Sequence, residues 1–232
     1  MPEISQKVGS NHHRCGSDHV GPALQQLTDR RCRAWEGVMA FRNQAAFNKP
    51  SSRMMAEGMD LRTSNAIVDH RGNVLAYAQT GGIIAPTRFE IAPGTTLFRF
   101  GNITAGVHRV AGGAWWMEQA AFEKLFNFAQ VHDLSVGVAL RYLCLVPPEW
   151  SDATLLIRAR AVAPLLAWRG LANSVVTKAN DGGPAVRMPQ QNEIAARRVH
   201  QLFIPGLDGG ALSIEQDYPL DKESSRRGFL YL

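Results

Sequence analysis

A glutamine and a glutamate stand two residues apart in the stretch Arg187-Met-Pro-Gln-Gln-Asn-Glu-Ile-Ala-Ala196. On an extended chain, side chains at positions i and i+2 point to the same side. Gln191 and Glu193 would therefore face one cleft, and Asn192 would point away from it. An amide of this kind can orient a substrate, and the carboxylate can stabilise a positive charge that develops nearby. A polar turn that leads into a strand is the alternative interpretation.

A second candidate is an arginine inside an apolar segment, Leu97-Phe98-Arg99-Phe100, which indicates a short strand. A buried guanidinium without a partner is energetically costly. Arg99 is therefore expected to meet a carboxylate, a phosphate or solvent. The first outcome would be a structural salt bridge, whereas the second would be a binding site for an anionic ligand.

Two tryptophans follow a glycine pair in Gly112-Gly113-Ala114-Trp115-Trp116. Their flat rings could stack on the adenine or nicotinamide ring of a cofactor. They could equally belong to the core, because alternate residues of a strand cover both faces of a sheet. By contrast, His12, His13, Cys15 and His19 lack the paired spacing of a metal site, so no metal is expected.

The pattern along the chain predicts both helices and strands around these residues. We therefore expect an α+β fold with mostly antiparallel strands. A helix is predicted over 118–132, and 134–146 is apolar enough to be either a helix or a strand. The strands and the hairpin are expected at 65–78 (a hairpin that turns at 70–73), 97–100, 153–162, 165–170, 194–199 and 201–205, with a loop over 177–186.

The 232 residues allow one large domain, or one domain with an appendage. We expect an N-terminal extension over 1–90, with a flexible start, a basic helix over 23–48 and the hairpin, and a main domain over 91–232. The extension could serve delivery or regulation, or belong to the fold. The net charge of +5 favours an anionic ligand or a nucleic acid, although many soluble proteins carry such a charge.

Cysteine content and hydropathy restrict where the protein could act. The three cysteines are widely spaced and odd in number, which suits a reducing compartment. No stretch reaches the roughly 20 apolar residues of a membrane span, and the N-terminus lacks the apolar core of a standard secretory signal peptide. The protein is expected to act in a cytoplasm, either its own or that of a target cell reached without such a signal.

The order of Arg99, the Gly-Gly-Ala-Trp-Trp element and Gln191-x-Glu193 resembles the mono-ADP-ribosyltransferase superfamily. The resemblance covers roughly residues 95–207 and is to the arginine–serine–glutamate branch, which includes cholera and pertussis toxins. It implies split, mostly antiparallel sheets around an NAD cleft, with NAD as substrate and no metal. It further implies that Arg99, Trp115 and Trp116 bind NAD, that Glu193 is catalytic and that Gln191 orients the acceptor.

The sequence departs from the family in its middle motif, a strand that bears Ser-Thr-Ser or a similar triplet and that, in the family, orients the glutamate and supports the nicotinamide site. Ser174 in Asn173-Ser-Val-Val-Thr177 and Ser135 are the candidates for this role, and neither is a clean copy. The Gly-Gly-Ala-Trp element is also similar to the Gly-Gly-Arg-Trp element of RES-type NAD-degrading toxins, with Ala114 in place of the arginine.

Three functions remain open at this point. The resemblance implies a bacterial toxin or effector that transfers ADP-ribose from NAD to a macromolecule, either a protein or a nucleic acid, and that has an inhibitory partner protein. The second is an NAD glycohydrolase, which passes the same group to water. The third is a non-catalytic binding module that uses the basic helix and the tryptophans.

Overall fold

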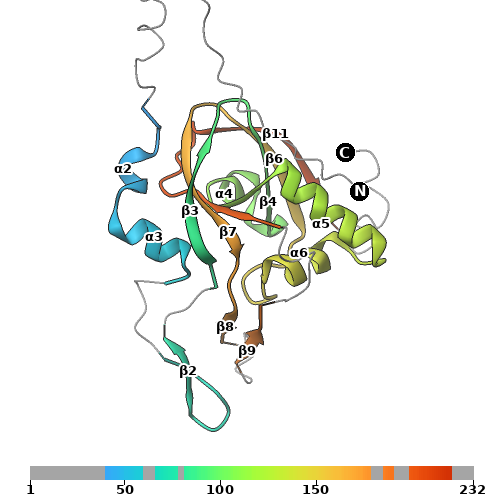
Figure 1. The fold of residues 1–232 in the computed structure, drawn as a ribbon. Coiled ribbons are helices and arrows are strands. Elements are labelled where there is room, and N and C mark those ends of the chain that lie inside the picture. Colours follow the sequence, from blue (N-terminus) through green and yellow to red (C-terminus); the bar gives the residue numbers. More distant parts are fainter. Residues whose placement is uncertain (1–39, 60–65, 78–80, 179–184, 191–198, 221–232) are drawn as a thin grey trace, which may run out of the picture. The chain divides into compact units, whose positions relative to one another are not determined.

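Seven antiparallel strands form the central sheet, in the order β11-β6-β4-β5-β10-β7-β3 (Figure 1). The structure is a computed structural model, and it describes residues 40–59, 66–77, 81–178, 185–190 and 199–220. The strands of the sheet are β3 (Ile83–Ile91), β4 (Thr96–Gly101), β5 (Trp115–Glu118), β6 (Leu155–Ala161), β7 (Leu165–Ala172), β10 (Gln201–Phe203) and β11 (Leu212–Pro219).

The central strand β5 joins the two halves of the sheet. Its first two residues pair with β10, and its last two pair with β4. The pairs are Trp115–Phe203 and Trp116–Leu202 on one side, and Met117–Phe98 and Glu118–Leu97 on the other. Strands β4 and β5 therefore stop pairing just where Arg99 begins, although β4 still pairs with β6 as far as Gly101. The predicted α+β class with antiparallel strands is confirmed, and the two sheets expected from the resemblance are two halves of one continuous sheet.

Two helices cover one face of this sheet (Figure 1). The predicted helix over 118–132 is confirmed as α5 (Gln119–Val131), and the segment left open at 134–146 is the helix α6 (Val136–Cys144). Both contribute to an apolar cluster with β4, in which the rings of Phe98 and Phe122 stack at 4.2 Å. The shorter helices are α2 (Gln44–Phe47), α3 (Pro50–Ala56), η1 (Ile103–Ala105) and α4 (Val107–Ala111). None of the helices in the described ranges is long and apolar enough to cross a membrane.

Strand β3 lies across the domain boundary that was expected at residues 90 and 91. Its end residues Ile83 and Ile91 are buried, and it pairs with β7 at the edge of the sheet. Pro86 lies within β3, where the register shifts between Ile84 and Thr87. A proline donates no ladder hydrogen bond, and an edge strand with a bulge tolerates it for that reason. The compact unit accordingly begins at Ala40 and not near residue 91.

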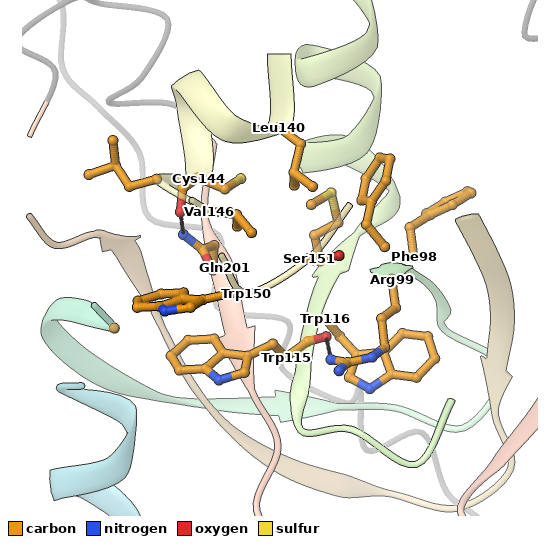
Figure 2. Close-up of a pocket in the computed structure, with 14 residues that line it drawn as sticks. Phe98, Arg99, Trp115, Trp116, Leu140, Cys144, Val146, Trp150, Ser151 and Gln201 are labelled. Carbon is orange, nitrogen blue, oxygen red and sulfur yellow. Dashed lines mark hydrogen bonds between the residues drawn. The ribbon is translucent and has the colours of Figure 1, made fainter. Parts of the chain in front are cut away.

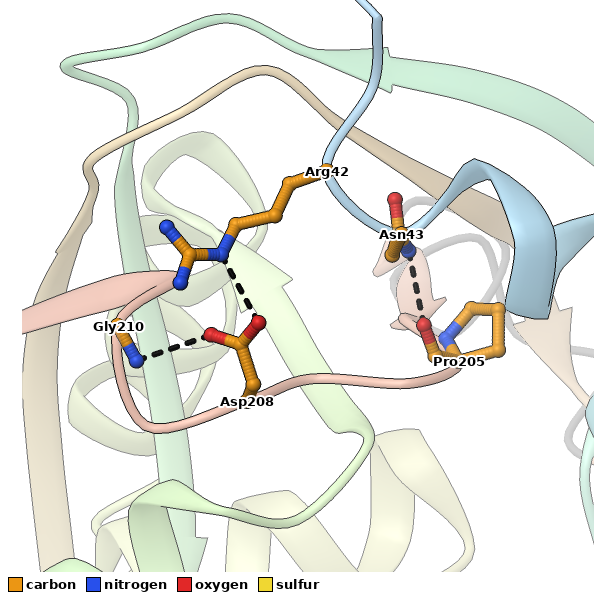
Figure 3. Close-up of polar contacts among 5 residues, drawn as sticks. All are labelled: Arg42, Asn43, Pro205, Asp208 and Gly210. Atoms are coloured by element: carbon orange, nitrogen blue, oxygen red, sulfur yellow. Dashed lines mark hydrogen bonds and ion pairs between the residues drawn. The ribbon is translucent and has the colours of Figure 1, made fainter.

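Residues ahead of β3 are also anchored to the sheet (Figure 3). Asn43 is 4% exposed, and its Nδ2 donates to the carbonyls of Leu166 and Pro205 at 2.8 and 2.9 Å. Its Oδ1 accepts from the amide of Leu166 at 2.8 Å. Beside it, Arg42 Nε lies 2.9 Å from Asp208 Oδ2. The backbone at Asn43 is not helical, so the helix predicted over 23–48 does not continue unbroken to its expected end.

The predicted hairpin over 65–78 is confirmed as β1 (Ala66–Val68) and β2 (Val74–Tyr77). Asp69 holds its turn, since Oδ1 accepts from the amides of Arg71 and Asn73. A second hairpin, β8 (Val175–Thr177) and β9 (Val186–Met188), borders the segment predicted as a loop over 177–186. Most of the predicted strand over 194–199, the early histidines and most of the basic helix lie outside the described residues.

Candidate functional site

A pocket of about 340 Å³ lies beside β4, β5, α6 and β10 (Figure 2). Its volume falls within the roughly 300–1,000 Å³ of small-molecule sites. Aromatic and aliphatic side chains line most of it, and Arg99 is its charged residue. The lining residues are Gly82, Phe98, Arg99, Phe100, Trp115, Trp116, Met117, Leu140, Cys144, Leu145, Val146, Trp150, Ser151 and Gln201.

Arg99 occupies the gap in which β4 and β5 no longer pair. Its Nη1 donates to the carbonyl oxygen of Trp115 (Figure 2). This hydrogen bond takes the place of a backbone pairing between β4 and β5 beyond Phe98. Gly113 lies directly against the guanidinium, because a Cβ built there would be 1.9 Å from Arg99 Nη2. A Cβ at Gly112 would meet only backbone oxygens at 3.5 Å or more. Of the two glycines, Gly113 is therefore the one whose missing side chain makes room for the arginine.

Arg99 is partly buried, and its guanidinium is poorly satisfied. Burial lowers its pKa from the ordinary 12.5 to about 10, so the group remains charged at neutral pH. Among the described residues, its buried Nε has no hydrogen-bond partner and no carboxylate forms an ion pair with it. A cation that is largely removed from water is unfavourable unless an anion compensates it. The arrangement therefore favours an anionic ligand, and a guanidinium offers that ligand a planar fork of donors.

The two predicted tryptophans have different environments. Trp116 is 2% exposed and its Nε1 donates to the Gly113 carbonyl at 2.8 Å, so most of its ring belongs to the core. Trp115 is half-buried, lines the pocket and packs its ring edge-on against Phe203 at 5.0 Å. Of the pair, Trp115 has the more accessible ring for stacking on a ligand.

A third tryptophan was missed by the reasoning from sequence. Trp150 lines the pocket, is 37% exposed, and donates from Nε1 to Thr177 Oγ1 of β8 at 3.0 Å. It follows Pro147-Pro148 in the loop after α6, where an isolated large aromatic residue was the available signal. Its exposed ring makes Trp150 a second surface on which a flat ligand could stack.

The serine candidates lie away from the pocket lining. The Ser174 hydroxyl accepts from the amide of Gln190 at 3.0 Å, and Ser135 caps α6 by accepting from the amide of Val138. The serine that lines the pocket is Ser151, which donates to Asn102 Oδ1 at 2.8 Å. The proposed nicotinamide role of Ser174 therefore gains no support from its position.

Gln191 and Glu193 lie outside the described residues, so their approach to Arg99 remains a prediction. The chain is described again from Val199, which is buried, and β10 follows with the pocket residue Gln201. Gln201 was not singled out from the sequence. Its Nε2 donates to the carbonyl of Cys144 at 2.9 Å.

Cys144 contributes an uncharged surface to the pocket wall. Burial raises the pKa of its thiol from the ordinary 9.0 to about 12, which keeps the group protonated at neutral pH. Because the thiolate is the nucleophilic form, Cys144 is unsuited to attack a ligand. Nowhere in the described ranges do three or more His, Cys, Asp or Glu side chains gather as metal ligands would.

Comparison with known proteins gives two distant structural likenesses. No family model and no curated protein matches the sequence. The structure titled "Rhs1-CT in complex with cognate immunity protein RhsI1" has a TM-score of 0.37 and 10% identity, over 62% of this chain and 88% of that one. The structure titled "Structure of Tne2 in complex with Tni2" has a TM-score of 0.34 and 14% identity, over 58% of this chain and 92% of that one. Both TM-scores are below 0.5, so neither likeness establishes a fold family or a function for this chain.

Proposed function

We propose that the protein cleaves the nicotinamide–ribose bond of NAD and transfers the ADP-ribosyl group to a macromolecular acceptor. The observation that carries the proposal is Arg99, a partly buried cation that lines an aromatic pocket and has no carboxylate partner among the residues that the structure describes. Such a site suits a ligand that has both an anionic group and a flat ring. NAD has a pyrophosphate and two ring systems, so it fits both requirements.

Arg99 would hold the pyrophosphate. The planar guanidinium can donate two parallel hydrogen bonds to phosphate oxygens, and such charge-assisted bonds are about twice as strong as neutral ones. The half-buried ring of Trp115 and the exposed ring of Trp150 would stack on the base or the nicotinamide.

Glu193 would supply the catalytic carboxylate. When the glycosidic carbon–nitrogen bond breaks, nicotinamide leaves with the bonding electrons and the ribose carbon becomes positively charged. A fixed carboxylate stabilises that charge most strongly in the transition state. The acceptor atom then bonds to the ribose carbon and releases its proton, and Gln191 would orient this acceptor. In the sequence, Glu193 precedes the pocket residue Gln201 by only a few positions.

We further propose that the protein is a bacterial toxin or effector and that a partner protein inhibits it. It is based on the resemblance of Arg99 and Gln191-x-Glu193 to the toxin branch of the superfamily. A partner that covers the pocket would block NAD without any change in the fold.

The test is to incubate the purified chain and a cell lysate with NAD that carries a label in its adenylate half. We expect label to appear on a macromolecule while nicotinamide is released, and we expect Glu193→Gln to reduce both at least about a hundredfold. Label recovered only as free ADP-ribose would indicate a glycohydrolase. A folded protein that neither consumes NAD nor gains thermal stability from it would refute the proposal in favour of a non-catalytic binding module.

A further inference from the structure

The orientation of the Gln201 side-chain amide is fixed by its partner. Gln201 is the first residue of β10, and its Nε2 donates to the Cys144 carbonyl at 2.9 Å (Figure 2). A carbonyl oxygen only accepts hydrogen bonds, so the amide nitrogen must face it and Oε1 must face the other way. Cys144 ends α6, and the last carbonyls of a helix lack partners within the helix. The bond therefore satisfies a helix end and holds the amide in one orientation.

The pocket wall around this amide is apolar and uncharged. Leu140 and Leu145 are buried there, and Cys144 carries a neutral thiol. Figure 2 shows Arg99 on the opposite side of the pocket from Gln201. The pocket thus has a cation at one side and an oriented, uncharged amide at the other.

We propose that Gln201 selects a ligand whose ring carries an uncharged primary carboxamide, with Oε1 accepting one N–H of that group. The inference rests on the proposed function, because the nicotinamide end of NAD is such a ring. A carboxylate in its place would bring a negative charge against an acceptor oxygen and an apolar wall, which is unfavourable. Sites that hydrogen-bond a substrate group reject analogues that lack it, because the buried polar group of the site is then left unpaired.

The test compares three free ring compounds by calorimetric titration of the full chain: nicotinamide, 3-acetylpyridine and nicotinic acid. In 3-acetylpyridine a methyl group replaces the amide NH₂, so the shape is kept and the donor is lost. We expect wild-type protein to bind nicotinamide roughly tenfold more tightly than 3-acetylpyridine, the value of one buried hydrogen bond. Nicotinic acid reports whether the Arg99 cation captures a free carboxylate in the same pocket. Binding of nicotinamide and 3-acetylpyridine within about twofold of each other, or no binding of nicotinamide at millimolar concentration, would overturn the inference.

A pair of variants isolates Gln201. Gln201→Leu should reduce the preference for nicotinamide over 3-acetylpyridine to about one, because leucine offers no acceptor. The matched control is Gln130→Leu on the exposed surface of α5, which should retain the wild-type preference. A folded Gln201→Leu protein that retains the preference contradicts the inference. If that variant does not fold, the three-compound series on wild-type protein decides.

The failure of this inference can be told apart from the failure of the proposed function, because the titrations need no turnover. A carboxamide preference in a protein that leaves NAD intact would support the role of Gln201 and refute the proposed function. Cleavage of NAD by a protein without this preference would refute the role of Gln201 alone.

Discussion

Substituting Gly113 with alanine would disturb the proposed anion site without altering Arg99. The new Cβ would lie 1.9 Å from Arg99 Nη2 and 2.3 Å from Cζ, which is too close for both groups to stay in place. The backbone at Gly113 does not have a positive φ, so alanine itself introduces no backbone strain. The guanidinium must therefore move away from the Trp115 carbonyl to which it donates.

The size of the effect follows from the contacts that would be lost. A hydrogen bond to a charged group contributes about 1.5–3 kcal/mol, and the guanidinium, as the end of a flexible side chain, otherwise yields to the new Cβ at little cost. If Arg99 holds the pyrophosphate, we expect NAD affinity to fall roughly 10- to 150-fold. The free energy of unfolding should decrease by about 1.5–3 kcal/mol, because the hydrogen bond to the Trp115 carbonyl is lost.

Isothermal titration with NAD measures the affinity, and circular dichroism establishes that the variant is folded. Gly112→Ala is the matched control, since its Cβ would meet only the His108 and Arg109 carbonyl oxygens at 3.5 and 3.7 Å. We expect this neighbour to bind NAD like the wild type. A folded Gly113→Ala protein with unchanged NAD affinity would refute the assignment of Arg99 as the anion-binding residue.

Three further predictions concern catalysis, stability and pH. Glu193→Gln should reduce NAD turnover at least about a hundredfold in a nicotinamide-release assay while NAD binding changes little, because the carboxylate acts mainly on charge that develops in the transition state. Asn43→Ala should lower the free energy of unfolding in urea by about 3 kcal/mol or more, because three buried backbone groups lose their partner. The Cys144 thiol stays protonated in the folded state up to about pH 12, whereas the unfolded thiol ionises near its ordinary 9.0. Between these two pKa values the folded state binds more protons than the unfolded state, so the free energy of unfolding falls as pH rises. At about pH 10, this free energy should have fallen by roughly 1.4 kcal/mol more in wild-type protein than in Cys144→Ala.

Each of these predictions has a control or a contradicting outcome. Near-normal turnover of Glu193→Gln would remove the catalytic role of that residue. Asn48→Ala, at an exposed position close to Asn43, should change stability by no more than about 0.5 kcal/mol. An identical loss of stability in wild-type and Cys144→Ala protein between about pH 7.5 and pH 10 would show that the thiol is not buried in the folded state.

Local patterns in the sequence were sufficient to locate several elements. The apolar periodicity over 118–132 indicates α5 because side chains three and four positions apart share one face of a helix. The hairpin over 65–78 follows from two apolar runs around a Gly-Asn turn. The costly burial of a strand arginine singled out Arg99, and the structure places it in the pocket.

Strands at the edge of the sheet were harder to predict. β3 contains Pro86, which argues against a strand in the middle of a sheet, and β11 is a mostly polar edge strand that was not predicted. An edge strand pairs on one side only and tolerates both features. The place of β3 in the sheet order cannot be read from its own residues. The boundary was therefore expected near residue 91, at the end of a strand that belongs to the sheet.

The pocket itself depended on contacts between distant parts of the chain. Sequence alone determined that Trp115 and Trp116, as neighbours on a strand, point to opposite faces, but only packing decided that Trp116 enters the core. Arg99 lies beside Gly113 because β4 and β5 pair for two residues and then part, and Gln201 of β10 meets Cys144 at the end of α6, 57 positions away in the chain. Periodicity reports which residues share a face of one element, whereas strand order and register are set by the burial of all the elements together. The pocket is formed by that order and register, and so only the tertiary structure could decide it.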